Sequence, residues 1–239
     1  MIIAMIIISV YYVFKNENIY WLVNKINNVF TSYCKDPAIF NPNDFDWTKN
    51  FRLKWKDVRN EYLSYTTHHI VPNHKSINST VASCDLNNSW KTLYLRAYGV
   101  DTKLAKYFPK TMDLINQCPC TLAFFSLLEP GAKLNPHTGI YKGVIRYHLG
   151  LIVPEQWTKC FINIDGKNLY WREGEDIMFD DMYTHYVENN TNQQRVILFL
   201  DIKRDFHNIF LNCMNSIFLR FIKSNDVLNN TITNINEYA

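Results

Sequence analysis

The sequence contains few of the residues that mark linkers, fibres and disulfide frameworks. Only 7 glycines and 8 prolines occur among 239 residues, which excludes collagen-like and linker-type chains. The 6 cysteines, at positions 34, 84, 118, 120, 160 and 213, lack the paired spacing of a disulfide framework, and positions 118 and 120 are too close for a zinc knuckle. We therefore expect free, mostly buried thiols, and the cysteine content leaves the compartment open.

An excess of charge of one sign is also absent. Lys and Arg number 25 against 22 for Asp and Glu, and this balance argues against a nucleic-acid partner. The hydrophobic content of 47%, with 15% aromatic residues, is sufficient for a packed core and excludes wholesale disorder. No internal repeat is evident. The length predicts one domain with appendages, or two small domains at most.

The N-terminus is an unbroken apolar and aromatic run, residues 1–14, that ends before Lys15. As a helix this run would be about 21 Å long, which is shorter than the roughly 30 Å hydrocarbon core of a bilayer. The basic segment and small-residue cleavage site of a secretory signal are both missing. The run favours a short membrane anchor over a packed or β-type segment. Without such an anchor we expect a soluble intracellular protein.

Irregular structure and one helix are expected before the first strands. Turn signals between residues 15 and 50 predict a stalk or irregular lead-in. Residues 51–65 place apolar side chains at helical spacing and predict one amphipathic helix. His68, His69 and His74 follow in a polar stretch. Because acidic and thiol partners are missing there, a solvated loop is favoured over a metal site.

From Trp90 onward the sequence changes to short apolar segments separated by turn signals. Strands are predicted at 93–97, 122–128, 144–153, 160–164, 169–172, 177–180, 184–188 and 196–202. A helix is predicted over 103–117, and another over 207–223 is expected to cap the barrel rather than to lie on a membrane. The predicted fold class is mainly β with flanking helices, and a jelly roll closes so many short strands naturally.

Polar residues within these strands are unevenly distributed. His137 follows a Pro-Gly turn and His185 begins a later strand, while Arg146 and His148 stand two residues apart and share a strand face. Arg195 begins the last long apolar strand, where an unpaired guanidinium facing inward would be costly. Two histidines from different strands with inward basic residues suit a metal plus a dianionic ligand. Scattered structural histidines and arginines are the alternative.

These residues lie in stretches that closely resemble the aspartyl/asparaginyl β-hydroxylase family of Fe(II)/2-oxoglutarate-dependent oxygenases. The stretches are SLLEPGAKLNPHTG (126–139), VIRYHLGLIVP (144–154), LYWREGEDIMFDDMYTHYVEN (169–189) and QRVILFLDIKR (194–204). Their ordered combination is specific, whereas any one of them alone is a weak signal. The resemblance covers residues 90–205, about half of the chain, and implies a double-stranded β-helix, the cupin-like jelly roll.

The resemblance implies that His137 and His185 are the iron ligands. Most related oxygenases carry a carboxylate two residues after the first histidine, but Gly139 stands there, as in the β-hydroxylase family. Fe²⁺ with dianionic 2-oxoglutarate and two neutral imidazoles then sums to zero charge. Water could fill the vacated position, and a relocated carboxylate from Asp180 or Asp181 is the alternative. Turn formation is the expected role of both aspartates.

Five further residues are implied to line the cosubstrate pocket. Arg195 would bind the distal carboxylate of 2-oxoglutarate, assisted by the Ser126 hydroxyl. Arg146 and His148 would line the same pocket, although a cross-strand pair could also hold them. Trp90 is similar to the family's upstream pocket tryptophan, with simple core packing as the alternative.

The activity implied by the resemblance is β-hydroxylation of Asp or Asn residues in a polypeptide, which consumes O₂ and 2-oxoglutarate and yields succinate and CO₂. The same chemistry on a lipid acyl chain or a free amino acid is one alternative, and a catalytically silent β-helix binding module is another. A membrane-facing lipid hydroxylase would account for the apolar N-terminus and the C-terminal helix. The expected organisation is an apolar segment (1–14), a lead-in packing on the core (15–89), the oxygenase core (90–205), and a helix with a polar tail (206–239).

Overall fold

The structure is a computed structural model that describes residues 19–77, 84–85, 87–223, 232–233 and 235–237. The apolar run 1–14 lies outside the described residues, so its role as a membrane anchor stays a prediction. In the described part of the chain, no helix combines the length and the apolar character needed to cross a membrane.

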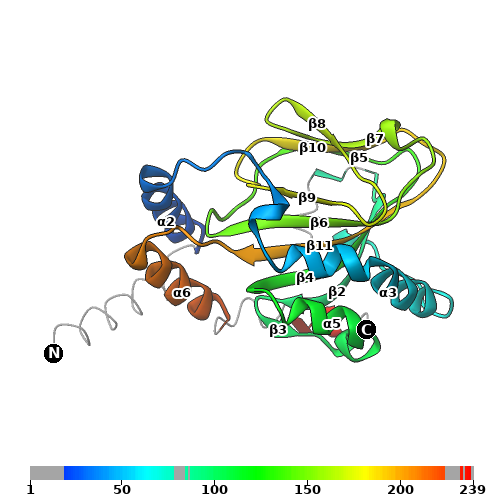
Figure 1. The fold of residues 1–239 in the computed structure, drawn as a ribbon, viewed down its shortest axis with the longest axis horizontal. Coiled ribbons are helices and arrows are strands. Elements are labelled where there is room, and N and C mark those ends of the chain that lie inside the picture. Colours follow the sequence, from blue (N-terminus) through cyan, green and yellow to red (C-terminus); the bar gives the residue numbers. More distant parts are fainter. Residues whose placement is uncertain (1–18, 78–83, 86, 224–231, 234, 238–239) are drawn as a thin grey trace.

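Two antiparallel sheets form the core (Figure 1). The larger has the strand order β1-β9-β6-β11-β4-β2-β3 and the smaller β5-β10-β7-β8. The bounds are β1 Ile39–Phe40, β2 Trp90–Ala97, β3 Val100–Asp101, β4 Cys120–Leu128, β5 Lys133–His137, β6 Val144–Ile152, β7 Cys160–Ile164, β8 Lys167–Tyr170, β9 Asp176–Phe179, β10 His185–Asn189 and β11 Arg195–Lys203. From β4 to β11 the chain passes back and forth between the sheets, which is the double-stranded β-helix that the sequence predicts.

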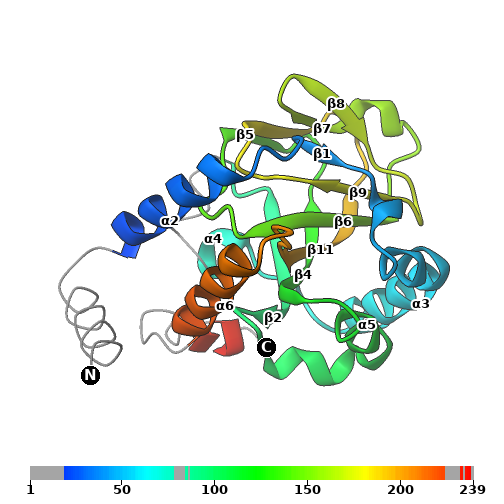
Figure 2. The same cartoon turned by 60° about the vertical axis from the view of Figure 1, so that its left-hand side comes forward.

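Helices cover one face and one end of this core (Figures 1 and 2). Their bounds are α2 Ile19–Tyr33, α3 Thr48–Thr66, α4 His74–Ile77, α5 Pro109–Ile115 and α6 Ile209–Lys223, with short 3₁₀ turns at Pro42–Asp44, Lys103–Tyr107 and Trp157–Lys159. Helices α3 and α5 pack on the outer face of the large sheet. Helices α2 and α6 lie side by side at one end of the molecule in both views.

Alternation along the strands divides the core into two layers. On β11, Leu198 and Leu200 belong to the layer under α3 and α5, whereas Ile197 and Phe199 belong to the layer between the sheets. Because the side-chain period of a strand is two, Arg195 falls on the same inner face as Ile197. The strand therefore directs a charged side chain into the space between the sheets.

Most predicted elements are present, with small shifts at their ends. The segment predicted as a strand at 169–172 is instead β8, Lys167–Tyr170, and the predicted helix 103–117 is divided at Pro109 into a 3₁₀ turn and α5. Strand β5 was not predicted, because its Pro136 is unusual within a strand. Its position in the small sheet shows that His137 ends a strand rather than lying in a loop.

Two predictions for the first third of the chain are wrong. The segment 15–50 contains a regular helix, α2, whose Phe30 is fully buried against Phe206 with ring centroids 4.2 Å apart. The helix is stabilised by packing against a partner about 175 residues later in the sequence, which the local pattern does not reveal. His74 is not solvated but only 2% exposed at the start of α4.

Candidate active site

Strands β5 and β10 bring His137 and His185 together as direct cross-strand partners. Their ring centroids are 4.2 Å apart. Nδ1 of His137 lies 2.7 Å from the Asn135 carbonyl oxygen, and Nδ1 of His185 lies 2.9 Å from that of Tyr183. A carbonyl can only accept, so each Nδ1 carries the proton and each Nε2 keeps a free lone pair.

Both imidazoles are neutral at pH 7. Burial lowers the pKa of His185 to about 3, and the nearby Arg146 charge lowers it further. Burial also lowers the pKa of His137. Neutral imidazole nitrogens with free lone pairs are metal ligands, so the pair fits a metal ion. Within the described ranges, no group of three or more His, Cys, Asp or Glu side chains is arranged to hold a metal. The donor set is thus two nitrogens.

Arg195 is a buried cation whose charge is not balanced. Its side chain is 2% exposed and lies over the Trp171 ring, 4.4 Å from the centroid. Nη1 donates to the Ser126 carbonyl oxygen at 3.2 Å and lies 3.4 Å from the Ser126 Oγ. Among the described residues Arg195 forms no ion pair, unlike the buried Arg146 and Arg204. Burial lowers the pKa of Arg195 to about 10, so the guanidinium stays charged and suits a carboxylate ligand.

A chain of contacts joins Arg195 to Trp90. The Trp90 Nε1 donates to the Ser126 Oγ at 2.9 Å. On its other side, Trp90 stacks on His74 with ring centroids 3.9 Å apart. His74 is in turn held by Thr92, whose Oγ1 lies 3.2 Å from its Nδ1. The indole is therefore fixed on both sides and directs the serine hydroxyl beside the guanidinium.

His148 presents an unused imidazole on the same inner face. Neither of its ring nitrogens has a hydrogen-bond partner among the described residues, although the side chain is buried. Burial, followed by the charges of Arg195 and Arg146, lowers the pKa of His148 well below its usual value. Burying these ring nitrogens without hydrogen-bond partners costs folding free energy. Because their hydration is already lost in the folded protein, an N–H of this ring can donate to a bound ligand with little further desolvation.

One cavity between the sheets collects these side chains. It is lined by Trp90, Ser126, Leu134, His137, Arg146, His148, Ile162, Phe179, His185, Val187, Arg195, Ile197 and Phe199. All seven site residues predicted from the sequence are among them. Apolar residues from both sheets make up the rest of the wall. The sequence analysis did not name Trp171, whose ring packs against the Arg195 guanidinium. Its place in the LYW stretch, residues 169–171, could have suggested it.

Arg146 differs from Arg195 because carboxylates surround it. It pairs with Asp181 at 2.8 Å and with its cross-strand partner Asp201 at 3.1 Å. The Asp181 carboxylate also fills the space beside Gly139, where an added Cβ would lie 2.1 Å from the Asp181 Cγ. Burial raises the pKa of Asp181 to about 6. Any side chain at position 139 would thus compete with Asp181 for the same space.

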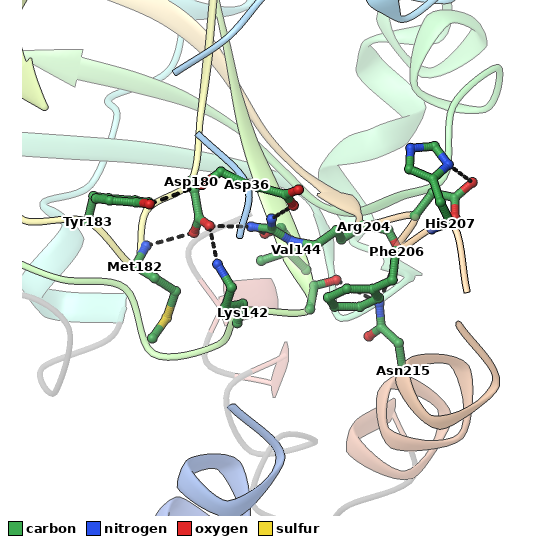
Figure 3. A network of polar contacts seen from close by, with 12 residues as sticks. Asp36, Lys142, Val144, Asp180, Met182, Tyr183, Arg204, Phe206, His207 and Asn215 are labelled. Carbon is green, nitrogen blue, oxygen red and sulfur yellow. Dashed lines mark hydrogen bonds and ion pairs between the residues drawn. The ribbon is translucent and has the colours of Figure 1, made fainter. Parts of the chain in front are cut away.

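Asp180 forms the expected turn and also a buried ionic network (Figure 3). Its carboxylate accepts from the Met182 amide at 3.1 Å, and it pairs with Lys142 at 2.6 Å and Arg204 at 2.7 Å. Arg204 pairs in addition with Asp36 of the lead-in segment. The sequence did not reveal this network, because its members are spread from residue 36 to residue 204. Charged residues flanking apolar strands were the only available signal.

Known proteins are similar to this chain over most of its length. A family profile described as aspartyl/asparaginyl beta-hydroxylase matches residues 52–205. The chain is 34% identical over 196 residues to the ornithine lipid ester-linked acyl 2-hydroxylase of Rhizobium tropici, covering 79% of this chain and 70% of that protein. It is 27% identical over 164 residues to the Homo sapiens aspartyl/asparaginyl beta-hydroxylase, covering 64% of this chain but only 20% of that protein.

Solved structures share a part of the fold at low sequence identity. A Cupin_2 domain of an XRE family transcriptional regulator from Enterobacter cloacae is 16% identical with a TM-score of 0.35, covering 49% of this chain and 99% of that chain. A predicted oxalate decarboxylase from Thermotoga maritima is 17% identical with a TM-score of 0.34, covering 48% and 81%. The fold described above rests on the strand order of this chain itself.

Proposed function

Because the chain belongs to the aspartyl/asparaginyl β-hydroxylase family, we propose that it is an Fe(II)- and 2-oxoglutarate-dependent dioxygenase. The observation that carries the proposal is one cavity with two neutral histidines on one sheet and an unbalanced buried guanidinium on the other. The two histidines fit a divalent metal, and the guanidinium fits the carboxylate of a dianionic cosubstrate. Succinate and CO₂ would be the co-products.

His137 and His185 would hold the iron through their Nε2 atoms, because backbone carbonyls engage both Nδ1 atoms. When bound, Fe(II) with 2-oxoglutarate and O₂ supplies the hydroxylation of an unactivated C–H bond. The carbonyl contacts fix the ring orientations before the metal arrives. This arrangement lowers the reorganisation needed on binding.

The large sheet would bind the cosubstrate. Arg195 would clamp its distal carboxylate, and the Ser126 hydroxyl, directed by Trp90, would add a second polar contact. His148 would offer a hydrogen bond from an otherwise unsatisfied ring nitrogen. Arg146 keeps its carboxylate partners, so it forms part of the cavity wall without offering an unpaired charge. The apolar remainder of the cavity excludes water from the reacting atoms.

The names of the relatives point to two substrate classes, and the sequence similarity favours a lipid. The match to the rhizobial lipid hydroxylase covers 79% of this chain and 70% of that protein, whereas the match to the human enzyme covers 20% of that protein. The acyl chain of a membrane lipid is therefore the first candidate. The β-carbon of Asp or Asn in a polypeptide is the second, supported by the family profile.

The cosubstrate site is tested by adding Fe(II) and then 2-oxoglutarate to metal-free protein under anaerobic conditions. A visible metal-to-ligand charge-transfer band is expected only after both additions. It should be lost in His137→Ala and need far more 2-oxoglutarate in Arg195→Leu, but persist in Arg172→Leu, whose arginine stacks on Trp157. Absence of the band from folded protein would refute the proposal. Succinate release with acyl lipid micelles or with an Asp-containing peptide then separates the two substrate classes.

A further inference from the structure

Helix α2 holds the loop that connects the two halves of the cavity. This loop, residues 138–143, follows His137 on β5 and leads into β6. The buried Asn27 of α2 donates from Nδ2 to the Ile140 carbonyl at 2.8 Å and accepts from the Lys142 amide at 2.9 Å. These two hydrogen bonds make α2 a direct support of the chain that carries the first histidine.

Helix α6 holds the same loop from its other end. The fully buried Asn215 donates from Nδ2 to the Gly143 carbonyl at 2.8 Å and accepts from the Tyr141 hydroxyl at 2.8 Å. The Tyr141 ring also packs on Phe218 of α6, with centroids 4.8 Å apart. Both helices thus use buried asparagines to position the loop, although each lies outside the matched family region 52–205.

Both helices expose large apolar side chains, on α2 among polar ones. On α6, Ile209, Phe210 and Ile217 are 79%, 81% and 62% exposed. Since each helical residue turns by about 100°, these three side chains fall within an arc of roughly 100°. On α2 the exposed apolar side chains are Trp21, Val29 and Tyr33. We name these six residues the α2–α6 face, because the two helices lie side by side (Figures 1 and 2).

The charges of the two helices all have one sign. Neither α2 nor α6 contains an Asp or Glu, whereas α2 carries Lys25 and α6 carries Arg220 and Lys223. Amphipathic helices with aromatic side chains and only basic charges are typical of segments that lie in the interface of an anionic membrane. Helix α3 exposes Leu53 and Leu63 among charges of both signs, so it lacks the purely basic character of α2 and α6.

We propose that the α2–α6 face docks the protein on a phospholipid bilayer with anionic head groups. The docked helices hold the loop after His137, so docking places the cavity next to the acyl lipid of the same membrane. Ile140 on that loop, three residues after His137, is also half-exposed. The choice of a lipid substrate rests on the proposed function, whereas the docking itself does not require iron or 2-oxoglutarate.

Docking is tested by sedimenting the full-length protein with vesicles of phosphatidylcholine, with or without an equal part of phosphatidylglycerol. Binding is expected to be stronger with phosphatidylglycerol. The double variant Phe210→Gln/Ile217→Gln should bind about tenfold more weakly or worse, since two apolar side chains no longer enter the interface. Leu53→Gln/Ile70→Gln, at positions 70% and 93% exposed elsewhere, is the matched control and should bind as the unchanged protein does.

Three outcomes would overturn docking through this face. The protein could fail to bind vesicles, or the double variant could bind undiminished, which would assign binding to another segment such as residues 1–14. The third is a concentration-dependent dimer, measured by sedimentation velocity, that the double variant abolishes, since the face would then be a contact between copies. The anaerobic charge-transfer band is measured on the same variants. Normal bands without vesicle binding would refute docking alone, and binding without a band would refute the oxygenase alone.

Discussion

Two groups of buried charge lie in the same β-helix and differ in how their charge is balanced. Arg204 is fully buried but pairs with Asp36 and Asp180, the second of which also pairs with Lys142 (Figure 3). Arg195 is equally buried and, among the described residues, has no carboxylate partner. A balanced cluster joins segments of the fold, whereas an unbalanced cation at a cavity leaves its carboxylate to be supplied by a ligand.

Arg146 combines a feature of each group, because it lines the cavity but is paired with carboxylates. It lines the cavity with Arg195 but is paired with Asp181 and Asp201, as the members of the structural cluster are paired. The position of an arginine on an inner strand face is therefore not sufficient to assign a ligand-binding role. Its carboxylate neighbours decide between the two roles.

The largest expected effect is on the balanced cluster. Asp180→Asn would leave Lys142 and Arg204 with too little negative charge, which should lower the free energy of unfolding by about 3–5 kcal/mol. Urea denaturation measures this loss. Asp165→Asn, in an exposed turn, is the control and should change little. A loss below about 1 kcal/mol for Asp180→Asn would mean that the network does not stabilise the fold.

Arg195→Met should weaken ligand binding without lowering the stability of the fold. It removes an unbalanced buried cation, so the free energy of unfolding should stay constant or rise, while the dissociation constant of 2-oxoglutarate should rise about a hundredfold. Anaerobic calorimetry with Fe(II) present and urea denaturation measure the two quantities. Arg204→Met is the matched variant and should lose stability instead. Equal destabilisation by both substitutions would contradict the distinction between the clusters.

Gly139→Ala tests the contact between the site and the carboxylates. The added Cβ would lie 2.1 Å from the Asp181 Cγ, so we expect a loss of about 1–3 kcal/mol in unfolding free energy. Asp181→Gly should relieve this clash, and the double variant should therefore lose less than the sum of the single losses. Urea denaturation of all four proteins gives the coupling. Strict additivity would show that Asp181 does not restrict position 139.

The last expected effect is a gradual pH dependence, and it concerns His74 behind Trp90. Burial lowers the pKa of His74 to about 4, so between about pH 6.5 and pH 4 the unfolded chain binds a proton that the folded chain does not. This histidine should reduce the free energy of unfolding by up to about 1.4 kcal/mol per pH unit as the pH falls through that range. His74→Phe should show a shallower acid dependence in urea denaturation than the unchanged protein does. Equal slopes would contradict the pKa assigned to His74.

Local pattern was sufficient for most strands of the β-helix and for helices α3 and α6, but not for helix α2 or strand β5. Strands such as β7, Cys160–Ile164, were predicted with both ends correct because alternation and turn residues are local signals. Helix α2 was missed because its buried face is defined by Phe206 and by the loop after His137. Strand β5 was missed because its proline is tolerated at the edge of the small sheet.

The sequence alone determined which side chains could form the site. The side-chain period of a strand places Arg146 and His148 on one face, and the resemblance to the β-hydroxylase family selected His137, His185 and Arg195. Tertiary structure alone decided which of the inner charges are balanced. Arg204 meets Asp36 across 168 positions of sequence, and Arg146 meets Asp201 across 55. Charge compensation depends on distances of a few ångströms between such remote positions, and only the folded chain brings them together.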